Sequence, residues 1–250
     1  MHYVDPTHRI DSIVASEQAQ ALDAVEAFPR HGAYTENAKL DERSFARPAP
    51  KRGHWAIKRG LDLLLAVLLL AVLLPVIALM AVLIKLDSPG PVFFRQRRIG
   101  RRGQQFGMLK FRTMVDGADD RKEELRHLNQ AADGLFKIHE DPRITRVGRW
   151  LRKTSLDELP QLFQVLSGEM SIVGPRPLVP EEDAQIHGPF RCRTEVRPGM
   201  TGPWQVAGSS QVPIDEMMEL DRDYVENWTA WRDVSLIVQT IPHVVMRRGH

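Results

Sequence analysis

An uninterrupted apolar run of 22 residues, Leu63–Ile84, constrains this chain more than any other feature of its sequence. The run contains no charged or strongly polar side chain, and as a helix it would be about 33 Å long, close to the hydrocarbon thickness of a bilayer. It starts too far into the chain for a secretory signal peptide, exceeds the usual apolar region of one, and is not followed by a small-residue cleavage pattern. We therefore expect a retained membrane segment.

Basic residues flank this run on both sides, and they bear on how it meets the membrane. Asp87 is the only acid between residues 85 and 113. The cations are Lys51, Arg52, Lys58 and Arg59 before the run, and Lys85, Arg95, Arg97, Arg98, Arg101, Arg102, Lys110 and Arg112 after it. Because cytoplasmic flanks are enriched in Lys and Arg, both ends are expected on the cytoplasmic side.

Pro75 lies near the middle of the run and removes one backbone hydrogen bond. It leaves arms of 12 and 9 residues, about 18 and 14 Å long as helices, and neither arm alone spans a bilayer. We favour a re-entrant helix that bends at Pro75 and returns to its own side. A straight single-pass anchor is the alternative.

Composition divides the chain into three zones. Residues 1–50 are polar and end in closely spaced prolines, which predicts a mobile N-terminal tail. Residues 51–87 hold the basic flank and the membrane helix, and residues 88–250 form the globular part. The 34 Lys and Arg nearly balance the 32 Asp and Glu, so overall charge does not indicate nucleic-acid binding. Cys192, the single cysteine, excludes an internal disulfide and cysteine-based zinc sites.

Two short strands are expected directly after the membrane segment. Apolar residues at 92–94 and 106–111 flank the turn Gly100-Arg101-Arg102-Gly103, which predicts a basic hairpin that leaves the bilayer. Its arginines could hold anionic lipid headgroups or a phosphate-bearing substrate. Residues 117–130, rich in both charges, predict a solvated helix without a chemical role.

The densest group of chemically useful residues lies between positions 141 and 162. Arginines recur there at every third position: Arg143, Arg146, Arg149 and Arg152. A helix that begins near Thr145 would carry the last three along one side and bury Trp150 and Leu151. A second helix is expected from Pro160 to the Ser167-Gly168 pair.

Asp157 and Glu158 stand side by side between these two predicted helices. The spacing from Ser155 to Glu158 matches a capping box, so ordinary helix capping is one explanation of the two acids. The nearby arginines, and a further arginine fixed between the prolines of Gly174-Pro175-Arg176-Pro177, favour another. Carboxylates that serve as magnesium ligands or as a nucleophile, among arginines for phosphate oxygens, are the groups that phosphoryl transfer requires.

Several longer motifs carry a family resemblance. They are GPVFFRQRRIG at 90–100, KFRTM at 110–114, SLDELPQL at 155–162, MSIVGPRP at 170–177 and RPGMTG at 197–202. In this order, from about Lys58 to the C-terminus, the chain resembles the bacterial sugar transferase family. These are monotopic phosphoglycosyl transferases that start the assembly of exopolysaccharide, O-antigen or glycoprotein glycans. The first fifty residues lie outside the resemblance.

The resemblance implies transfer of a sugar 1-phosphate from a UDP-sugar to undecaprenyl phosphate, with release of UMP. Asp157 matches the nucleophile, which forms an acyl-phosphate intermediate. Glu158 matches the acid that helps to hold Mg²⁺, with Asp157 as a further ligand. Arg152 and Arg176 match positions that contact phosphate, and Asp233 matches an acidic position needed for activity.

The arginine stripe and the basic hairpin add Arg149 and Arg112 to the residues expected to bind the phosphates of the nucleotide. The partners implied by the resemblance are a UDP-sugar, undecaprenyl phosphate and inner-membrane lipids, without nucleic acid, and a homo-oligomer is left open. The closing stretches 224–228 and 240–242 look most like those of galactose- or glucose-phosphate transferases. A hexose donor is therefore expected, galactose before glucose.

The implied fold is a helix-rich α/β, membrane-associated monotopic domain. It combines the re-entrant helix bent at Pro75, the basic hairpin and a globular catalytic part on the cytoplasmic face of the bacterial inner membrane. A site at this boundary reaches both a lipid phosphate at headgroup level and a nucleotide from the cytoplasm. The segment 237–248 is expected to lie along the membrane, with a plain terminal helix as the alternative.

Two positions depart from the family pattern. Leu74 stands where serine usually precedes the bend proline, and Ser209 stands where an arginine usually follows the Trp204-Gln205-Val206 motif. Two other functions stay open at this point. One is a membrane-anchored protein that binds anionic lipid or polymer without catalysis, and the other is a magnesium-dependent nucleotide-sugar hydrolase.

Overall fold

The computed structural model describes residues 52–118, 120–122, 124–125, 127, 138, 141–208 and 213–245. The predicted tail at 1–50, Ser209 and the end of the segment 237–248 lie outside this described part. The membrane helix and the globular part belong to one compact unit. The elements, in chain order, are α2 (Arg52–Asp87), β1 (Phe93–Ile99), η2 (Arg101–Gly103), β2 (Gln105–Phe111), η3 (Asp120–Lys122), α3 (Arg146–Lys153), η5 (Leu156–Glu158), α4 (Gln161–Ser167), β3 (Ser171–Val173), α5 (Pro180–Asp183), η6 (Gly188–Thr194), β4 (Gly199–Thr201), α6 (Pro203–Val206), α7 (Ile214–Glu226) and α8 (Ala230–Val245).

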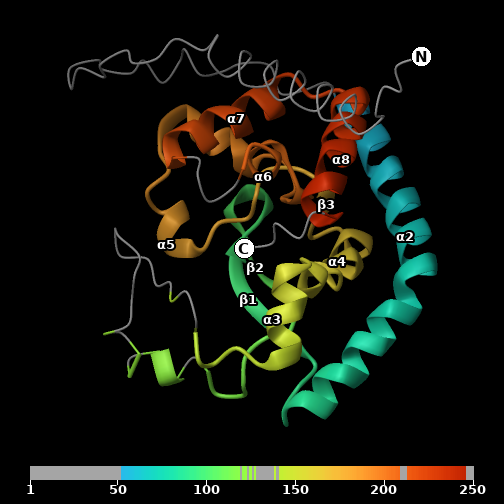
Figure 1. Cartoon of the computed structure of the whole chain (residues 1–250). Helices are drawn as coiled ribbons and strands as arrows, with labels where there is room; N and C mark the ends of the chain where they lie inside the picture. Colours follow the sequence, from blue (N-terminus) through green and yellow to red (C-terminus); the bar gives the residue numbers. More distant parts are fainter. Residues whose placement is uncertain are drawn as a thin grey trace, which may run out of the picture. The chain divides into compact units, whose positions relative to one another are not determined.

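The long helix α2 contains the whole apolar run and flanks the globular body (Figure 1). Its inner side is buried against the body through Ala66, Leu70, Ile77, Met80 and Ile84. In the described part of the chain it is the one helix long and apolar enough to cross a membrane, and only 17% of its most apolar window is buried inside the protein. Its outer side therefore needs another apolar environment.

The helix α2 stays helical through Pro75. The ribbon changes direction part-way along its length (Figure 1), as a proline inside a helix commonly causes. Polar contacts fix both ends to the same globular body. Near the start, Lys58 Nζ lies 2.7 Å from Asp233 Oδ2 on α8, and at the end, Asp87 Oδ2 accepts a 3.0 Å hydrogen bond from the Val147 backbone N–H of α3.

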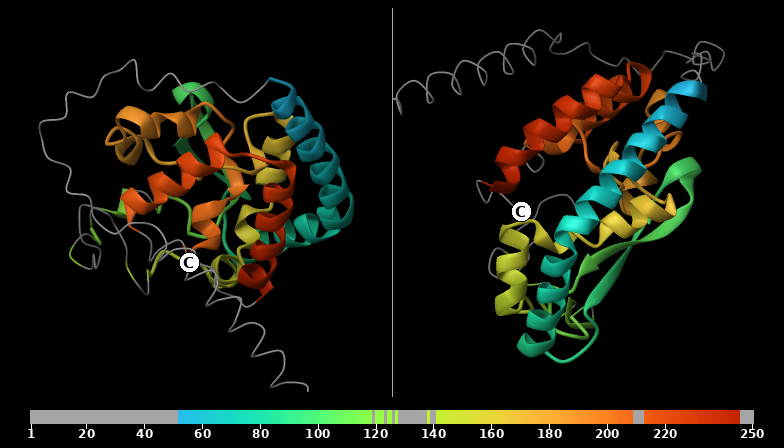
Figure 2. Two further views of the ribbon diagram at one scale, coloured as in Figure 1. Left: turned by 90° about the horizontal axis from the view of Figure 1, so that it is seen from above. Right: turned by 90° about the vertical axis from the view of Figure 1, so that its right-hand side faces the viewer.

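The two strands expected after the membrane segment are present as β1 and β2. They pair antiparallel from Phe93 opposite Phe111 to Ile99 opposite Gln105. The connection contains Arg102 at a φ of 57°. This ribbon leaves the C-terminal end of α2 and runs back towards the start of the helix (Figure 2, right), so its tip lies near the first turns of α2.

A second small sheet lies deeper in the body. β3 and β4 pair in parallel, with Ser171 opposite Gly199 and Val173 opposite Thr201. Parallel pairing needs a long crossover, and the chain between the two strands supplies α5 and η6. The largest fully buried side chains of the described part include Tyr224, Phe111, Leu151, Leu162 and Met170. Over the residues that the structure describes, the fold is thus helix-rich with two separate two-stranded sheets.

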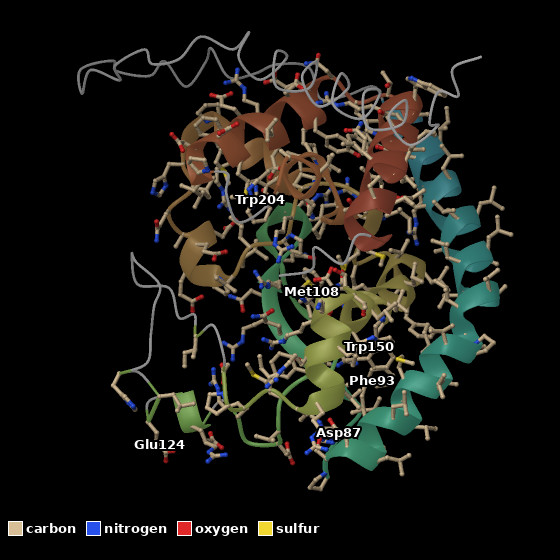
Figure 3. All side chains as sticks on the ribbon, in the orientation of Figure 1. Asp87, Phe93, Met108, Glu124, Trp150 and Trp204 are labelled. Carbon is tan, nitrogen blue, oxygen red and sulfur yellow. The ribbon has the colours of Figure 1, made fainter. Side chains whose placement is uncertain are left out.

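The helix expected near Thr145 forms as α3, and the Thr145 hydroxyl caps it by accepting a 3.0 Å hydrogen bond from the Gly148 backbone N–H. Leu151 is fully buried as expected. The prediction was wrong for Trp150, which is 44% exposed and faces outward; Figure 3 labels it. Consecutive residues lie about 100° apart around a helix axis, so Trp150 and Leu151 cannot both face one narrow core.

The helix expected between Pro160 and Gly168 also forms, as α4, and it ends at Gly168 with a φ of 89°. The stretch 117–130 differs from expectation. Where the structure describes it, the chain forms the short turn η3 and further turns instead of a continuous α-helix. The stretch is rich in charged residues and has no apolar face that a helix could bury. Burial of such a face supplies most of the stability of a helix in a protein.

Candidate active site

Asp157 and Glu158 lie in the tight turn η5, which joins α3 to α4. Ser155 precedes them in the left-handed region, at a φ of 55°, and its side chain makes no capping hydrogen bond. The capping-box explanation of the two acids is therefore wrong. A serine held at positive φ costs on the order of 1 kcal/mol or more, and such strain is typical of functional turns.

Burial dominates the electrostatics of Asp157. It raises the pKa of this carboxyl from 3.8 to about 6, and the negative charge of Glu158 acts in the same direction. The positive charges of Lys110 and Arg152 oppose the increase. Asp157 is thus a half-buried carboxylate under the influence of two cations, an arrangement common among catalytic acids, bases and nucleophiles.

Glu158 is held by a lysine from the hairpin. Lys110 Nζ on β2 lies 2.7 Å from Glu158 Oε1, and both side chains are largely shielded from solvent. Sequence reasoning did not include Lys110 among the site residues. The signal was present, because Lys110 opens the KFRTM motif, but its partner lies 48 positions away in the chain.

Arg152 reaches the same region from α3. Its Nε donates a 2.8 Å hydrogen bond to Thr113 Oγ1. Burial lowers the pKa of Arg152, while the carboxylates of Asp157 and Asp141 oppose the decrease. The helix lies this close to Thr113 because position 148 is glycine: a Cβ atom there would overlap the Thr113 carbonyl oxygen.

Arg176 lies next to Glu158 across a small hollow. The guanidinium stacks 5.2 Å from the centre of the Trp204 ring. The hollow has about 210 Å³ of open space, and Arg176, Glu158, Met108 and Gln161 are among the residues around it; Met108 and Trp204 are labelled in Figure 3. The proline-flanked segment thus places Arg176 and the acidic turn around the same hollow.

Gln161 is a residue of this hollow that sequence reasoning missed. It is only 1% exposed, and its Nε2 group has no hydrogen-bond partner among the described residues. A buried amide donor without a partner costs free energy, so an acceptor oxygen of a ligand in the hollow would satisfy it. Its place three residues after Glu158 in the SLDELPQL motif is the signal that could have identified it.

Three other predicted residues lie elsewhere. Arg112 is buried and donates from Nη2 to the Ser88 carbonyl at 2.7 Å, so it fixes the chain where α2 ends. Arg149 is exposed on α3. Asp233 is buried, and it accepts hydrogen bonds from Lys58, Tyr224 and Trp228. The structure does not bring Arg112 or Asp233 into contact with the acidic turn, and a role in binding phosphate stays a prediction for all three.

The described residues contain no group of three or more His, Cys, Asp or Glu side chains that could hold a metal ion. In the turn η5, Asp157 and Glu158 offer two neighbouring carboxylates. Such a pair fits Mg²⁺, which proteins usually bind through one or two carboxylates while water and substrate phosphates complete the coordination.

Comparison with known proteins identifies the family. Residues 53–247 match the profile of bacterial sugar transferases. The chain belongs to the bacterial sugar transferase family. The resemblance carried by the five motifs is therefore confirmed. This family member has Asp157, Glu158, Lys110, Arg152 and Arg176 gathered around one turn.

Its relatives are similar over most of the described chain. The exopolysaccharide production protein ExoY of Sinorhizobium fredii is 42% identical over 196 residues, 77% of this chain and 87% of the relative. The UDP-galactose-lipid carrier transferase of Erwinia amylovora is 40% identical over 197 residues, but these are only 41% of the relative. The UDP-glucose:undecaprenyl-phosphate glucose-1-phosphate transferase of Caulobacter vibrioides is 40% identical over 209 residues, 79% of this chain and 73% of the relative.

Proposed function

We propose that this sugar transferase moves a hexose 1-phosphate, galactose or glucose, from a UDP-sugar to undecaprenyl phosphate and releases UMP. This would be the first step in assembly of exopolysaccharide or another surface glycan. The observation that best supports this proposal is the acidic turn. Asp157 and Glu158 do not form a capping box. Cations from three separate parts of the chain, Lys110, Arg152 and Arg176, lie around the two acids. The names of the relatives support the substrates.

The proposed reaction has two displacements at the phosphorus that carries the sugar. A carboxylate oxygen of Asp157 attacks this phosphorus, the bond to the UMP oxygen breaks, and UMP leaves with the electron pair. An oxygen of undecaprenyl phosphate then attacks the acyl phosphate and releases the Asp157 carboxylate. The product is a sugar on a polyprenyl diphosphate, and all phosphorus–oxygen bonds balance.

Positive charge at the turn makes this attack feasible, because a diphosphate is repelled by two bare carboxylates. Lys110 and Arg152 face Asp157 directly, and Arg176 lies beside Glu158 in the hollow. Asp157 and Glu158 would hold Mg²⁺, which would supply further positive charge to the diphosphate of the donor and to the departing UMP. Arg149 is proposed as an outer phosphate contact, since it is exposed on the same helix as Arg152.

The pH dependence of turnover follows from the raised pKa of Asp157. Only the ionised carboxylate attacks, so kcat/KM is expected to rise as pH increases through about 6. Lys110→Gln removes the positive charge that most lowers the pKa of Asp157, so the rise of kcat/KM should move to higher pH. Initial rates with a UDP-sugar and a polyprenyl phosphate at a series of pH values measure both. A flat profile across this range contradicts the assignment.

Folding stability should decrease over the pH range in which turnover increases. Burial favours the protonated form of Asp157. The stability that this protonated carboxyl contributes is complete below its unfolded pKa of 3.8 and is lost as pH rises through about 6. The acid that makes the enzyme reactive therefore weakens the fold at neutral pH.

We also propose that α2 is re-entrant and that the active site lies at the cytoplasmic face of the inner membrane. Both ends of α2 form polar contacts with the same globular body, through Lys58 and Asp87. A straight crossing would place these ends on opposite faces of the bilayer, about 30 Å apart. Tags at both termini should be protected from external protease in intact cells, and cleavage of a single tag would favour a full crossing.

The last helix supports the same placement. α8 exposes Trp231, Val234, Val238 and Ile241 at spacings of three and four residues, so they form one apolar stripe. Packing against the described part of the body leaves this stripe exposed. We propose that α8 lies along the membrane surface with this stripe towards the lipid.

One assay separates the proposed reaction from its two alternatives. The protein is incubated with a UDP-hexose and Mg²⁺, with and without undecaprenyl phosphate, and UMP and lipid-linked sugar are followed. The transferase produces both, and the lipid product requires the lipid phosphate. A hydrolase releases UMP without lipid, and a binding protein produces neither, so either result overturns the proposal.

A further inference from the structure

A second cationic hollow lies at the start of α2 and shares none of its surrounding residues with the active-site hollow. It has about 300 Å³ of open space. The first turns of α2 form one wall, the tip of the β1–β2 ribbon a second, and the chain leading into β4 a third. Each wall contributes one arginine: Arg59, Arg101 and Arg197 respectively.

Two of these guanidinium groups lie side by side. Their Nη2 atoms stand 3.4 Å (Arg59) and 3.8 Å (Arg197) from the point that a Cβ atom on Gly168 would occupy. Part of their hydrogen bonding caps the C-terminal end of α4. Arg59 donates to the carbonyls of Val165 and Leu166 at 2.6 and 3.0 Å, and Arg197 Nε donates to that of Gly168 at 2.7 Å.

Arg101 and Arg197 each keep most of their hydrogen-bond donors unused. Arg101 donates only from Nε, to the Glu195 carbonyl at 3.0 Å. In the part of the chain that the structure describes, no hydrogen bond uses the terminal nitrogens of Arg101 or Arg197, and no acid forms an ion pair with either. Burial, together with the positive charges of Arg59 and Arg101, lowers the pKa of Arg197. Like charges gathered in this way are stabilised by an anion.

The acids nearest to the hollow do not supply this anion. Asp62 is buried at its wall, but its carboxylate already accepts hydrogen bonds from Ser171 Oγ and the Ile172 backbone N–H. It also lies 3.8 Å from Lys58 Nζ. Glu195 contributes its backbone carbonyl to Arg101 while its side chain is exposed to solvent.

The position of the hollow indicates where its anion comes from. Trp55 lies at its wall, and Ile57, Leu61 and Leu64 are exposed on the same turns of α2. The cationic hollow therefore borders the apolar surface that faces lipid in the proposed membrane placement. Phosphate groups of lipids lie at this boundary, and tryptophan is enriched there.

We propose that the hollow formed by Arg59, Arg101 and Arg197 binds the phosphate of an anionic phospholipid headgroup. It would do so separately from the reacting substrates and so fix the depth and tilt of α2. The terminal nitrogens of Arg101 and Arg197 donate to the phosphate oxygens, and guanidinium forks suit this geometry. This inference rests on the proposed membrane placement of α2, but not on the chemistry at Asp157.

The test uses the full chain in a neutral detergent. Binding of dihexanoyl phosphatidylglycerol, dihexanoyl phosphatidylcholine and inorganic phosphate is measured by thermal shift and calorimetry. Arg101→Gln is compared with Arg102→Gln, because both arginines are exposed at the same ribbon tip and only Arg101 lines the hollow. We expect the anionic lipid to bind most tightly, and its affinity to decrease about fivefold for Arg101→Gln but hardly for Arg102→Gln.

Equal losses in the two variants would mean diffuse attraction to the ribbon, and would overturn the site. Inorganic phosphate that binds as tightly as the lipid would assign the hollow to a free anion, and equal binding of the neutral-headgroup lipid would remove the role of charge. Asp157→Asn should retain normal lipid binding. Loss of catalysis in that variant therefore does not affect this inference, and a failed lipid test leaves the proposed reaction unaffected.

Discussion

Replacing Asp157 with Asn is expected to abolish sugar-phosphate transfer, with turnover at least about a thousandfold lower. The amide has nearly the same shape as the carboxylate but lacks the nucleophilic oxygen. The covalent phospho-sugar adduct, trapped from the wild-type protein with donor alone and detected by intact mass, should be absent from the variant. Normal turnover by Asp157→Asn would remove Asp157 as nucleophile.

A folding defect would not explain this loss. Since burial of the Asp157 charge raises its pKa to about 6, the ionised group destabilises the fold at neutral pH. The neutral asparagine should therefore unfold at an equal or higher temperature than the wild type. Asp215→Asn, at an exposed aspartate in the first turn of α7, is the matched control, and it should change neither turnover nor the unfolding temperature.

The second large effect is expected at Lys58, whose side chain is 4% exposed. Lys58→Met removes the cation that lies 2.7 Å from Asp233 Oδ2 and 3.8 Å from Asp62 Oδ1. Two buried carboxylates then lose their counter-charge, which costs about 3–5 kcal/mol when one partner of a buried pair is deleted. Thermal unfolding in one detergent, followed by circular dichroism, should show a decrease of roughly 10 °C for a chain of this size.

Two further variants make this test specific. Lys85→Met, at the exposed far end of the same helix, should leave the unfolding temperature nearly unchanged. Adding Asp233→Asn to Lys58→Met should recover part of the lost stability, because the double variant no longer contains one of the uncompensated carboxylates. Equal destabilisation by the two lysine variants would refute a structural role for the buried pair.

Local signals predicted the local parts of the fold. Thr145 marks a helix start through its capping hydroxyl, and Pro160 and Gly168 mark helix ends through their backbone preferences. The structure places α3 and α4 as these residues indicate. The pairing of β3 with β4 and the contact between Lys58 and Asp233 could not be predicted in this way. The latter joins residues 175 positions apart, and only the packed structure brings them together.

The active site shows the same division. Asp157, Glu158 and Arg152 are close in sequence, so one dense motif was enough to group them. Lys110 reaches them from β2, and its charge alone did not distinguish it from the other cations of the hairpin. The sequence likewise did not reveal that Arg112 donates to the Ser88 carbonyl just after α2, and its expected role in binding phosphate stays a prediction.

The one-sided burial of α2 has a consequence for how this enzyme can be handled. One side of the helix is an interior wall of the catalytic body, and the other is left for lipid. Removing α2 to obtain a water-soluble enzyme would expose the interior of the body to solvent and leave the buried Asp233 without its partner Lys58. Detergent or a nanodisc has to substitute for the missing leaflet, and α2 has to be purified together with the catalytic body.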